Sequence, residues 1–387
     1  MPARFKDQFL LDPEIHFLNH GSFGACPKPV FASMVDWQKR VERQPVELLD
    51  RQIVPEMKAS RRALADYLDC PYDDLVYFPN PTTAINMVAR NLELQPGDEI
   101  LSSDHEYGAM DRTWRYTTNQ AGATYVKCAV PLPVNTHEEF VENFWQRVTD
   151  RTRVIFLSQI TSQTGLIFPV AEICRRARDA GILTIIDGAH APGQIPVDLN
   201  EIAPDIYTGA CHKWLCAPKG SAFLYARKEI QAWLDPLVIS WGYQAEYPSE
   251  SQFVDYHEWQ GTRDMSAFLS VQDAIRFQQE NDWERVRSEC HAMVIQARDR
   301  IHQITGLVKI CPDGEEWLGQ MAAIPLPELE VSRLKDRLYR EYRVEVPVYR
   351  WEGKPFLRVS VQAYNTEEDL LALEKALTVL LHEEVMR

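Results

Sequence analysis

Residues 205–220 read Asp205-Ile-Tyr-Thr-Gly-Ala-Cys-His-Lys-Trp-Leu-Cys-Ala-Pro-Lys-Gly220, and the apolar run Ser221-Ala-Phe-Leu-Tyr225 follows directly. This stretch places Lys213 in a mostly apolar turn that is flanked by glycine. Desolvation lowers the pKa of a lysine ammonium group and so favours the free amine, which attacks carbonyl carbons. A lysine in a turn is more often a solvated surface residue, so this stretch alone leaves both interpretations open.

A second stretch lies upstream and reads Gly181-Ile-Leu-Thr-Ile-Ile-Asp187-Gly-Ala-His190-Ala-Pro. Its apolar run is typical of a strand buried on both faces of a parallel sheet, and open α/β sheets bind ligands where such strands end. A buried Asp187 needs a cationic partner. With a reactive Lys213 nearby, the protonated pyridine nitrogen of pyridoxal phosphate (PLP) is an economical choice. The simpler alternative is an aspartate that caps a turn.

The segments Asp187-Gly-Ala-His190 and His212-Lys213-Trp-Leu-Cys-Ala-Pro-Lys-Gly220 resemble motifs of fold-type I PLP enzymes, specifically of the class V aminotransferase family. Within that family the chain most resembles the isopenicillin N epimerase-like branch. Three further segments share the resemblance: Leu18-Asn-His-Gly-Ser-Phe-Gly-Ala25, Asp104-His-Glu-Tyr-Gly-Ala109 and Glu345-Val-Pro-Val-Tyr349. It extends from about Phe17 to the C-terminus and implies an aspartate aminotransferase-like fold.

The order of expected elements predicts the same α/β class. Short apolar strands alternate with helices of about ten residues, which favours a mainly parallel sheet with helices on both faces. We expect a large PLP-binding domain over residues 15–265 and a smaller C-terminal α+β domain over residues 280–387, on which residues 1–50 partly pack. In the C-terminal part we expect strands near residues 308–311, 321–324, 344–348 and 356–361. We also expect a helix near residues 332–342 and another at the end of the chain.

Two catalytic roles follow from the resemblance. Lys213 would carry PLP and, once displaced by an amino-acid substrate, would act as the base at Cα. Asp187 would keep the pyridine nitrogen protonated. The resemblance also places His105 where an aromatic ring stacks on the pyridine, with Tyr107 as the alternative, although a histidine at a strand tip is most often a satisfied polar group.

Further residues are expected to hold the cofactor. Thr82 and Thr83 begin an apolar-periodic run after a proline, which marks a helix N-terminus suited to phosphate. Capping alone would explain both hydroxyls, but the resemblance assigns this turn to the cofactor phosphate. It also places His190 near the ring hydroxyl and His212 near the phosphate. The chain has Ala210 where relatives often carry Ser or Asn, so one phosphate hydrogen bond is missing or has another donor.

Arg358 is the expected anchor of the substrate carboxylate. It lies in an apolar strand, Phe356-Leu-Arg-Val-Ser-Val-Gln-Ala-Tyr-Asn365, where an arginine is costly to bury without an anion. The resemblance makes Ser162 a further substrate contact. Other residues are equally explained as pocket-shaping or as ordinary surface loop: Asn19, His20, Tyr349 and Arg350.

The implied function is chemistry at the Cα of an amino acid through an external aldimine and a quinonoid. We rank epimerase or racemase activity first, cysteine or cystine C–S lyase activity second and transamination third. Persulfide-forming desulfuration is disfavoured, because Tyr342-Arg-Val-Glu-Val-Pro347 contains no cysteine where desulfurases place theirs. A PLP-binding scaffold without turnover is the non-enzymatic alternative.

The composition limits the partners. The chain has 387 residues and a net charge of -15, which argues against nucleic acid or an anionic membrane as a partner. The apolar runs are short and the first residues are charged, so we expect a cytoplasmic protein. The 8 cysteines lack CxxC spacing, which suits free thiols, and we expect no metal site.

The resemblance also implies a homodimer with shared active sites. Gly261-Thr262 follows an irregular aromatic segment, and we expect it to open a helix. In the family, the matching pair reaches the phosphate bound to the other subunit. An ordinary helix cap within one chain is the alternative.

Overall fold

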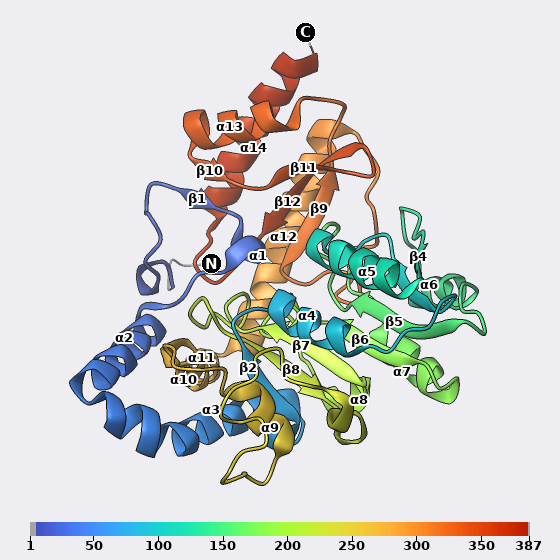
Figure 1. The fold of residues 1–387 in the computed structure, drawn as a ribbon. Helices are drawn as coiled ribbons and strands as arrows, with labels where there is room; N and C mark the ends of the chain where they lie inside the picture. Colours follow the sequence, from blue (N-terminus) through green and yellow to red (C-terminus); the bar gives the residue numbers. More distant parts are fainter. Residues whose placement is uncertain (1–4, 386–387) are drawn as a thin grey trace.

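The computed structural model describes residues 5–385, and its largest sheet has seven strands in the order β2-β8-β7-β6-β5-β3-β4 (Figure 1). β8 runs antiparallel to its neighbours β2 and β7, and the other neighbouring pairs are parallel. This confirms the expected mainly parallel sheet. The strands are β2 (Leu75–Phe78), β3 (Glu99–Ser103), β4 (Thr124–Cys128), β5 (Thr152–Ser158), β6 (Leu183–Asp187), β7 (Ile206–Ala210) and β8 (Ala222–Ala226).

Two apolar layers cover the sheet, because side chains alternate between its faces. On β5, Val154 and Phe156 belong to one cluster, and Ile155 and Leu157 belong to the other. The first cluster includes side chains of α4, α5 and α9, and the second includes those of α3, α6, α7, α10 and α11. These helices are α3 (Ile53–Leu68), α4 (Pro81–Asn91), α5 (Gly108–Ala121), α6 (His137–Trp145), α7 (Val170–Asp179), α9 (Gln252–Glu258), α10 (Ser266–Leu269) and α11 (Val271–Glu280).

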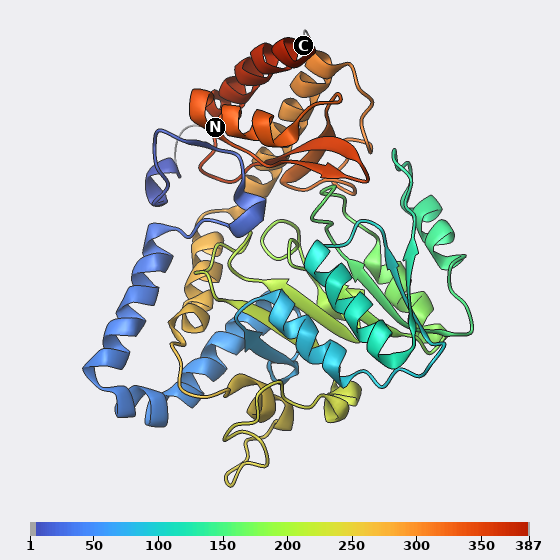
Figure 2. The same ribbon diagram turned by 45° about the horizontal axis from the view of Figure 1, so that its top comes forward.

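The C-terminal part has its own sheet, with the order β11-β12-β9 and antiparallel pairs. Together with α13 and α14 it sits beside the large sheet, and α12 runs between the two parts (Figure 2). The elements are α12 (Trp283–Thr305), β9 (Met321–Pro325), α13 (Val331–Tyr342), β10 (Val344–Glu345), β11 (Val348–Trp351), β12 (Lys354–Ser360) and α14 (Glu367–Val385). The α+β character of this region agrees with the expected fold class.

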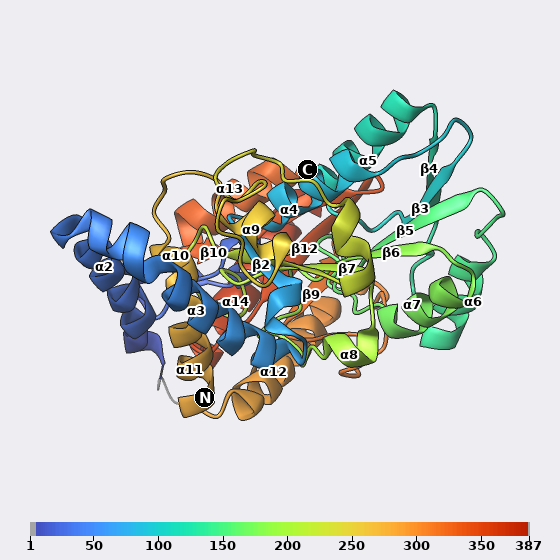
Figure 3. The same cartoon turned by 60° about the horizontal axis from the view of Figure 1, so that its bottom comes forward.

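The N-terminal segment crosses from one part to the other. β1 (His16–Phe17) pairs in parallel with β10, and α1 (His20–Phe23) follows directly. α2 (Lys28–Arg43) then leads away to one end of the molecule, while β4 and α6 lie near the opposite end (Figure 3). The short helix α8 (Leu199–Ile202) connects β6 to β7. α1 therefore lies at the junction, where it can contribute to a site between the two parts.

Two local predictions were wrong. Residues 308–311 form no strand, because Arg298 donates to the carbonyl of Cys311 and the carbonyl of Ile310 accepts from the Val134 N–H at 2.9 Å. Gly261-Thr262 does not open a helix either. Gly261 has a φ of +99°, and α10 begins only at Ser266.

Among residues 5–385, no helix combines the length and the apolar character that a membrane crossing requires.

Candidate active site

A cavity of about 280 Å³ lies at the carboxyl edge of the large sheet. Strand register brings Ser158 of β5 opposite Asp187 of β6, so neighbouring strands end side by side there. Ser158 and Asp187 line the cavity, and so do Lys213 and Arg358, which come from the β7–β8 connection and from β12. The structure therefore brings together three residues that lie far apart in the sequence and that we expected in one site.

Lys213 lies in the cavity beside His190. Its Nζ is 3.0 Å from Nε2 of His190. Burial lowers the pKa of Lys213 to about 8, the nearby Asp187 opposes this change, and the charge of Arg358 adds to it. Lys213 is therefore an uncharged amine, the form that attacks a carbonyl, in a larger fraction than a solvated lysine at the same pH, although the ammonium form still predominates at pH 7.

Two glycines with positive φ, Gly24 and Gly193, lie directly against the backbone on either side of Lys213. A Cβ on Gly24 would lie 2.0 Å from the carbonyl oxygen of His212, and one on Gly193 would lie 2.2 Å from that of Trp214. His20 lies behind the turn, where its Nε2 donates to the carbonyl of Lys213 at 3.0 Å. These contacts fix the turn, so His20 supports the lysine from behind.

Asp187 is 4% exposed at the end of β6. One carboxylate oxygen accepts from the Ala189 N–H at 2.9 Å, and within residues 5–385 the other has no hydrogen-bond partner. Burial raises the pKa of Asp187, whereas the Ala189 N–H and the charge of Lys213 lower it. A buried carboxylate with a free oxygen at a cavity fits the protonated ring nitrogen of PLP.

The N-terminus of α4 faces the same cavity. Asn80, Pro81 and Thr82 line it, and the side chain of Asn80 caps the helix by accepting from the Thr83 N–H at 2.8 Å. The structure places Thr82 at the cavity, whereas Thr83 donates its hydroxyl to Asn80 at 3.1 Å and is not part of the lining. A helix N-terminus with a free hydroxyl suits a phosphate.

His212 lies in the lining next to Lys213. Its Nδ1 donates to the carbonyl of Ser221 at 3.0 Å. Burial lowers the pKa of His212 to about 4, so Nε2 carries a lone pair at neutral pH. Donation to a phosphate would require protonation at Nε2, which the negative charge of a bound phosphate favours.

Arg358 is 6% exposed, and no carboxylate pairs with it in the described part of the chain. Its Nη1 donates to the carbonyl of Ser162 at 2.6 Å, its Nη2 donates to the hydroxyl of Ser22 at 3.1 Å, and its Nε has no partner. Burial lowers its pKa. A buried cation that contacts only neutral groups at a cavity favours an anionic ligand such as a carboxylate.

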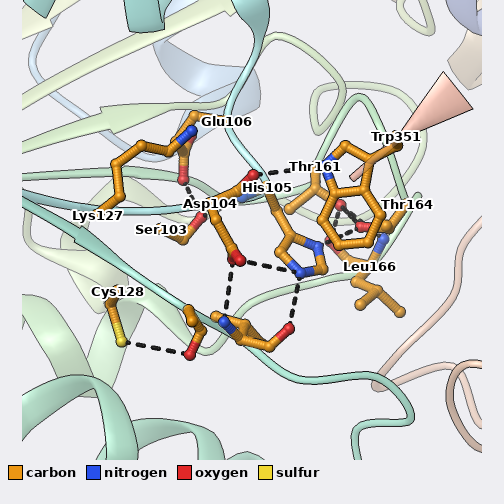
Figure 4. Close-up of polar contacts among 12 residues, drawn as sticks. Ser103, Asp104, His105, Glu106, Lys127, Cys128, Thr161, Thr164, Leu166 and Trp351 are labelled. Atoms are coloured by element: carbon orange, nitrogen blue, oxygen red, sulfur yellow. Dashed lines mark hydrogen bonds and ion pairs between the residues drawn. The ribbon is translucent and has the colours of Figure 1, made fainter. Parts of the chain in front are cut away.

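The expected stacking position of His105 is not the one observed, because the structure places His105 outside the cavity lining. Figure 4 shows the polar contacts that hold it. The imidazole is fully buried. Its Nε2 donates to the carbonyl of Val130 at 3.1 Å, and its Nδ1 accepts from the hydroxyl of Thr164 at 2.7 Å. Trp351 covers the ring at a centroid distance of 4.4 Å. Both ring nitrogens thus have hydrogen-bond partners, and one side of the ring packs against Trp351. His105, which follows β3, therefore contacts the loop of residues 159–166 and β11.

Tyr107, the alternative to His105, does line the cavity. It is the residue immediately before α5, and its side chain is 46% exposed. The ring is therefore free to contact a ligand. We propose Tyr107 as the aromatic residue that stacks on the cofactor.

We expect Tyr107→Leu to weaken PLP binding by up to about tenfold, since an aromatic contact is worth roughly 0.5–1.5 kcal/mol. Tyr107→Phe keeps the ring and should bind like the parent protein. The measurement is a fluorescence titration of cofactor-depleted protein with PLP. Unchanged binding by Tyr107→Leu, together with weakened binding by a folded His105→Leu variant, would instead support stacking by His105.

The remaining expected residues fall into two groups. Ser162 lines the cavity next to Arg358. The others lie outside the lining. The side-chain amide of Asn19 donates to Glu345 at 3.0 Å, and the hydroxyl of Tyr349 donates to the carbonyl of Gln163. Arg350 and Thr262 are both exposed, and Arg350 pairs with Glu328.

Several site residues received no role from the sequence. Ser22, in the quoted turn of residues 19–24, contacts Arg358, and Phe23 is 73% exposed at the cavity. Glu106 is buried and accepts from the hydroxyl of Ser103 at 2.6 Å (Figure 4). It also accepts from the hydroxyl of Ser158 at 2.6 Å, so it fixes Ser158 in the lining. Burial raises the pKa of Glu106 to about 8. The sequence feature that could have indicated a role for Glu106 was its place in the segment Asp104-His-Glu-Tyr-Gly-Ala109.

The sheet topology and the cavity together define a class of protein. A lysine, a buried carboxylate at a strand end and a helix N-terminus all face one cavity, and each suits a different part of PLP. The protein is a PLP-dependent enzyme of fold type I.

Comparison with known proteins identifies the family. The family model "Aminotransferase class-V" matches residues 25–373, so the chain belongs to this family. It is 35% identical to isopenicillin N epimerase of Amycolatopsis lactamdurans over 98% of both chains. It is 28% identical to a probable chloroplastic L-cysteine desulfhydrase of Arabidopsis thaliana over 96% of this chain and 84% of that one. A cysteine desulfurase structure from Escherichia coli shares the fold with a TM-score of 0.83, covers 99% of both chains and is 23% identical.

Proposed function

We propose that the protein inverts the configuration at Cα of an amino-acid substrate, as an epimerase or racemase similar to isopenicillin N epimerase. The main observation is that one amine base, Lys213, and one unpaired cation, Arg358, face the same cavity beside Asp187. The 35% identity to an isopenicillin N epimerase over 98% of the chain favours epimerisation over other Cα chemistry.

The positions of the residues support the following roles. Arg358 binds the substrate carboxylate, which holds Cα in the cavity. Lys213 removes the Cα proton as an uncharged amine, and delivery of a proton to the opposite face of Cα completes the inversion. Asp187 keeps a proton on the ring nitrogen of PLP, while the N-terminus of α4 and His212 hold the phosphate. When bound, PLP supplies an electron sink for the charge that develops at Cα.

The cysteines support this choice over persulfide-forming desulfuration. Among residues 5–385, no cysteine lines the cavity. Cys211 and Cys216, which flank Lys213, are fully buried, and burial raises both thiol pKa values far above the ordinary range. Neither is therefore a thiolate nucleophile at neutral pH.

A cysteine or cystine C–S lyase is the second candidate, because the chain is 28% identical to a probable L-cysteine desulfhydrase. Both reactions begin with the removal of the Cα proton. The test is incubation of the purified protein with single L-amino acids, followed by assays for the D-enantiomer and for pyruvate with sulfide. The D-enantiomer without pyruvate supports epimerisation, and pyruvate with sulfide supports the lyase. A keto acid formed together with the aminated cofactor would support transamination instead.

Replacing Arg358 with glutamine is expected to raise KM for the amino acid about 10- to 100-fold, since a charged hydrogen bond is worth roughly 1.5–3 kcal/mol. PLP should remain bound. Arg350→Gln is a matched control, because Arg350 lies on the adjacent strand but is exposed and outside the cavity. Steady-state kinetics measure the effect, with the same amino-acid substrate used for every variant and its concentration varied. An equal KM for Arg358→Gln and the parent would exclude Arg358 as the carboxylate anchor.

We also propose a homodimer in which Thr262 of one chain reaches the phosphate site of the other. Thr262 is exposed and lies outside the cavity lining of its own chain. Residues 238–247, which precede Thr262 in the chain, expose large apolar side chains, including Trp241 at 84% and Tyr247 at 87%. Exposed apolar groups of this size are typical of protein interfaces.

Co-expression of Lys213→Ala and Thr262→Ala chains is expected to restore activity. If sites are shared, one pocket of the mixed dimer contains both substitutions and the other is intact. The mixed dimer should therefore exceed both parent homodimers in an activity assay after tandem-tag purification. A fully active monomer would contradict the proposal. If Thr262→Ala alone is inactive, failure of the mixed dimer to recover activity would also contradict it.

A further inference from the structure

Trp214, the residue after Lys213, takes part in a short hydrogen-bonded chain that ends at the lysine. Its indole is fully buried, and its Nε1 donates to Nδ1 of His190 at 3.2 Å. Nε2 of the same imidazole is 3.0 Å from Nζ of Lys213. His190 thus lies between a group that can only donate and an amine that can do either.

The direction of the hydrogen bond from Trp214 to His190 determines the direction of the hydrogen bond between His190 and Lys213. Since an indole N–H has no acceptor, Nδ1 of His190 must offer a lone pair. A neutral imidazole then carries its proton on Nε2, the atom that faces Lys213. Nε2–H needs a lone pair on Nζ, which an uncharged nitrogen has and an ammonium group lacks.

We infer that Trp214 is a positioning residue that holds His190 in the Nε2–H tautomer and thereby favours an uncharged nitrogen on Lys213. The tautomer follows from the geometry alone. Its consequence for catalysis rests on the proposed role of Lys213.

Both rings are held by their surroundings. The carbonyl of Trp214 accepts from Nε2 of Gln278 at 3.0 Å, and the carbonyl of His190 accepts from Nε2 of Gln194 at 2.7 Å. The imidazole of His20 also packs on Trp214 at a centroid distance of 4.9 Å. The two glutamine bonds fix the backbone from which each ring extends, and burial of both residues restricts rotation of the rings.

The neighbouring charges oppose the alternative in which His190 is an imidazolium ion. The titratable and charged groups that act on it are Lys213, Arg358, His212 and His20. Arg358 is charged near neutral pH and disfavours a positive charge there, Lys213 does so when it is an ammonium ion, and burial keeps His212 and His20 neutral. Burial lowers the pKa of His190 further, and it is the largest cause. The neutral ring is therefore the form to consider near neutral pH.

The first test is ¹⁵N NMR of the full-length protein with labelled histidine and tryptophan, with His190 assigned through His190→Gln. We expect a pyridine-like shift for Nδ1, a pyrrole-like shift for Nε2 and a scalar coupling across the bond between Nδ1 and Nε1 of Trp214. Protonated Nδ1 in the unmodified protein would overturn the inference. This test does not depend on cofactor binding, so it is separate from the proposed function.

The second test compares Trp214→Phe with Trp114→Phe. Trp114 is also fully buried, but its indole N–H has no partner, so the control removes an indole without breaking this contact. In Trp214→Phe, His190 can change tautomer and accept from Lys213, so the apparent pKa of the lysine-linked cofactor band should rise by about one unit. The control should not change. Equal titration curves for Trp214→Phe and the parent protein would overturn the inference, while a linkage to another lysine would instead refute the proposed function. If Trp214→Phe does not fold, the scalar coupling decides.

Discussion

Replacing Lys213 with alanine is expected to abolish the covalent link to PLP and to lower turnover by at least roughly 10²–10⁴-fold, the contribution of a positioned base alone. The substitution removes the nucleophile and the base together, while the turn itself is held by other contacts, including the bond from His20 to the backbone of residue 213. The measurements are the visible absorption spectrum after PLP addition and the initial rate with the best substrate.

Lys219→Ala is the control for this variant. Lys219 lies in the same connection, but its Nζ donates to the carbonyl of Gly24 at 2.9 Å and it does not line the cavity. This variant should keep the lysine-linked absorption band. A Lys213→Ala protein that retains the band and the rate would show that another residue carries the cofactor.

Asp187→Asn is expected to keep the fold and to slow exchange of the substrate Cα proton by roughly 10²–10³-fold, comparable to the loss of one preorganised electrostatic group. The amide has nearly the same shape, and its oxygen still accepts from the Ala189 N–H. It cannot, however, stabilise a positive charge on the ring nitrogen. The measurement is proton NMR of the substrate in deuterated water.

Asp205→Asn is a matched control for Asp187→Asn. Asp205 is also buried, but it precedes β7, where it accepts from the N–H and hydroxyl of Thr184 at the opposite end of β6. Its loss should lower the free energy of unfolding without changing the exchange rate of the folded protein. If Asp187→Asn exchanged at the parent rate, Asp187 would be only a structural turn residue.

The fold and the centre of the site could be predicted because local signals and the family resemblance fall on the same segments. The apolar run before Asp187 indicates a buried strand, and the turn around Lys213 follows another, so both residues were expected at one edge of a parallel sheet. The buried arginine Arg358 was also recognisable, because an unpaired charge in an apolar strand requires an anion.

The rest depends on geometry that a linear pattern does not contain. His105 and Tyr107 are two residues apart, and only the actual turn after β3 decides which ring reaches the cavity. The contact between Trp214 and His190 joins residues 24 positions apart through side-chain orientation alone. Residues 308–311 have the composition of a strand, but the side chain of Arg298 occupies one of their carbonyls.

Borohydride reduction of the PLP-loaded protein, followed by peptide mass spectrometry, tests the central claim most directly. Reduction makes the bond between PLP and its lysine permanent, so the mass of the cofactor marks the residue that carries it. The account predicts that the label is found on Lys213, in the peptide that contains His212 and Trp214. A label on another lysine, or none on a protein that has bound PLP, would contradict it.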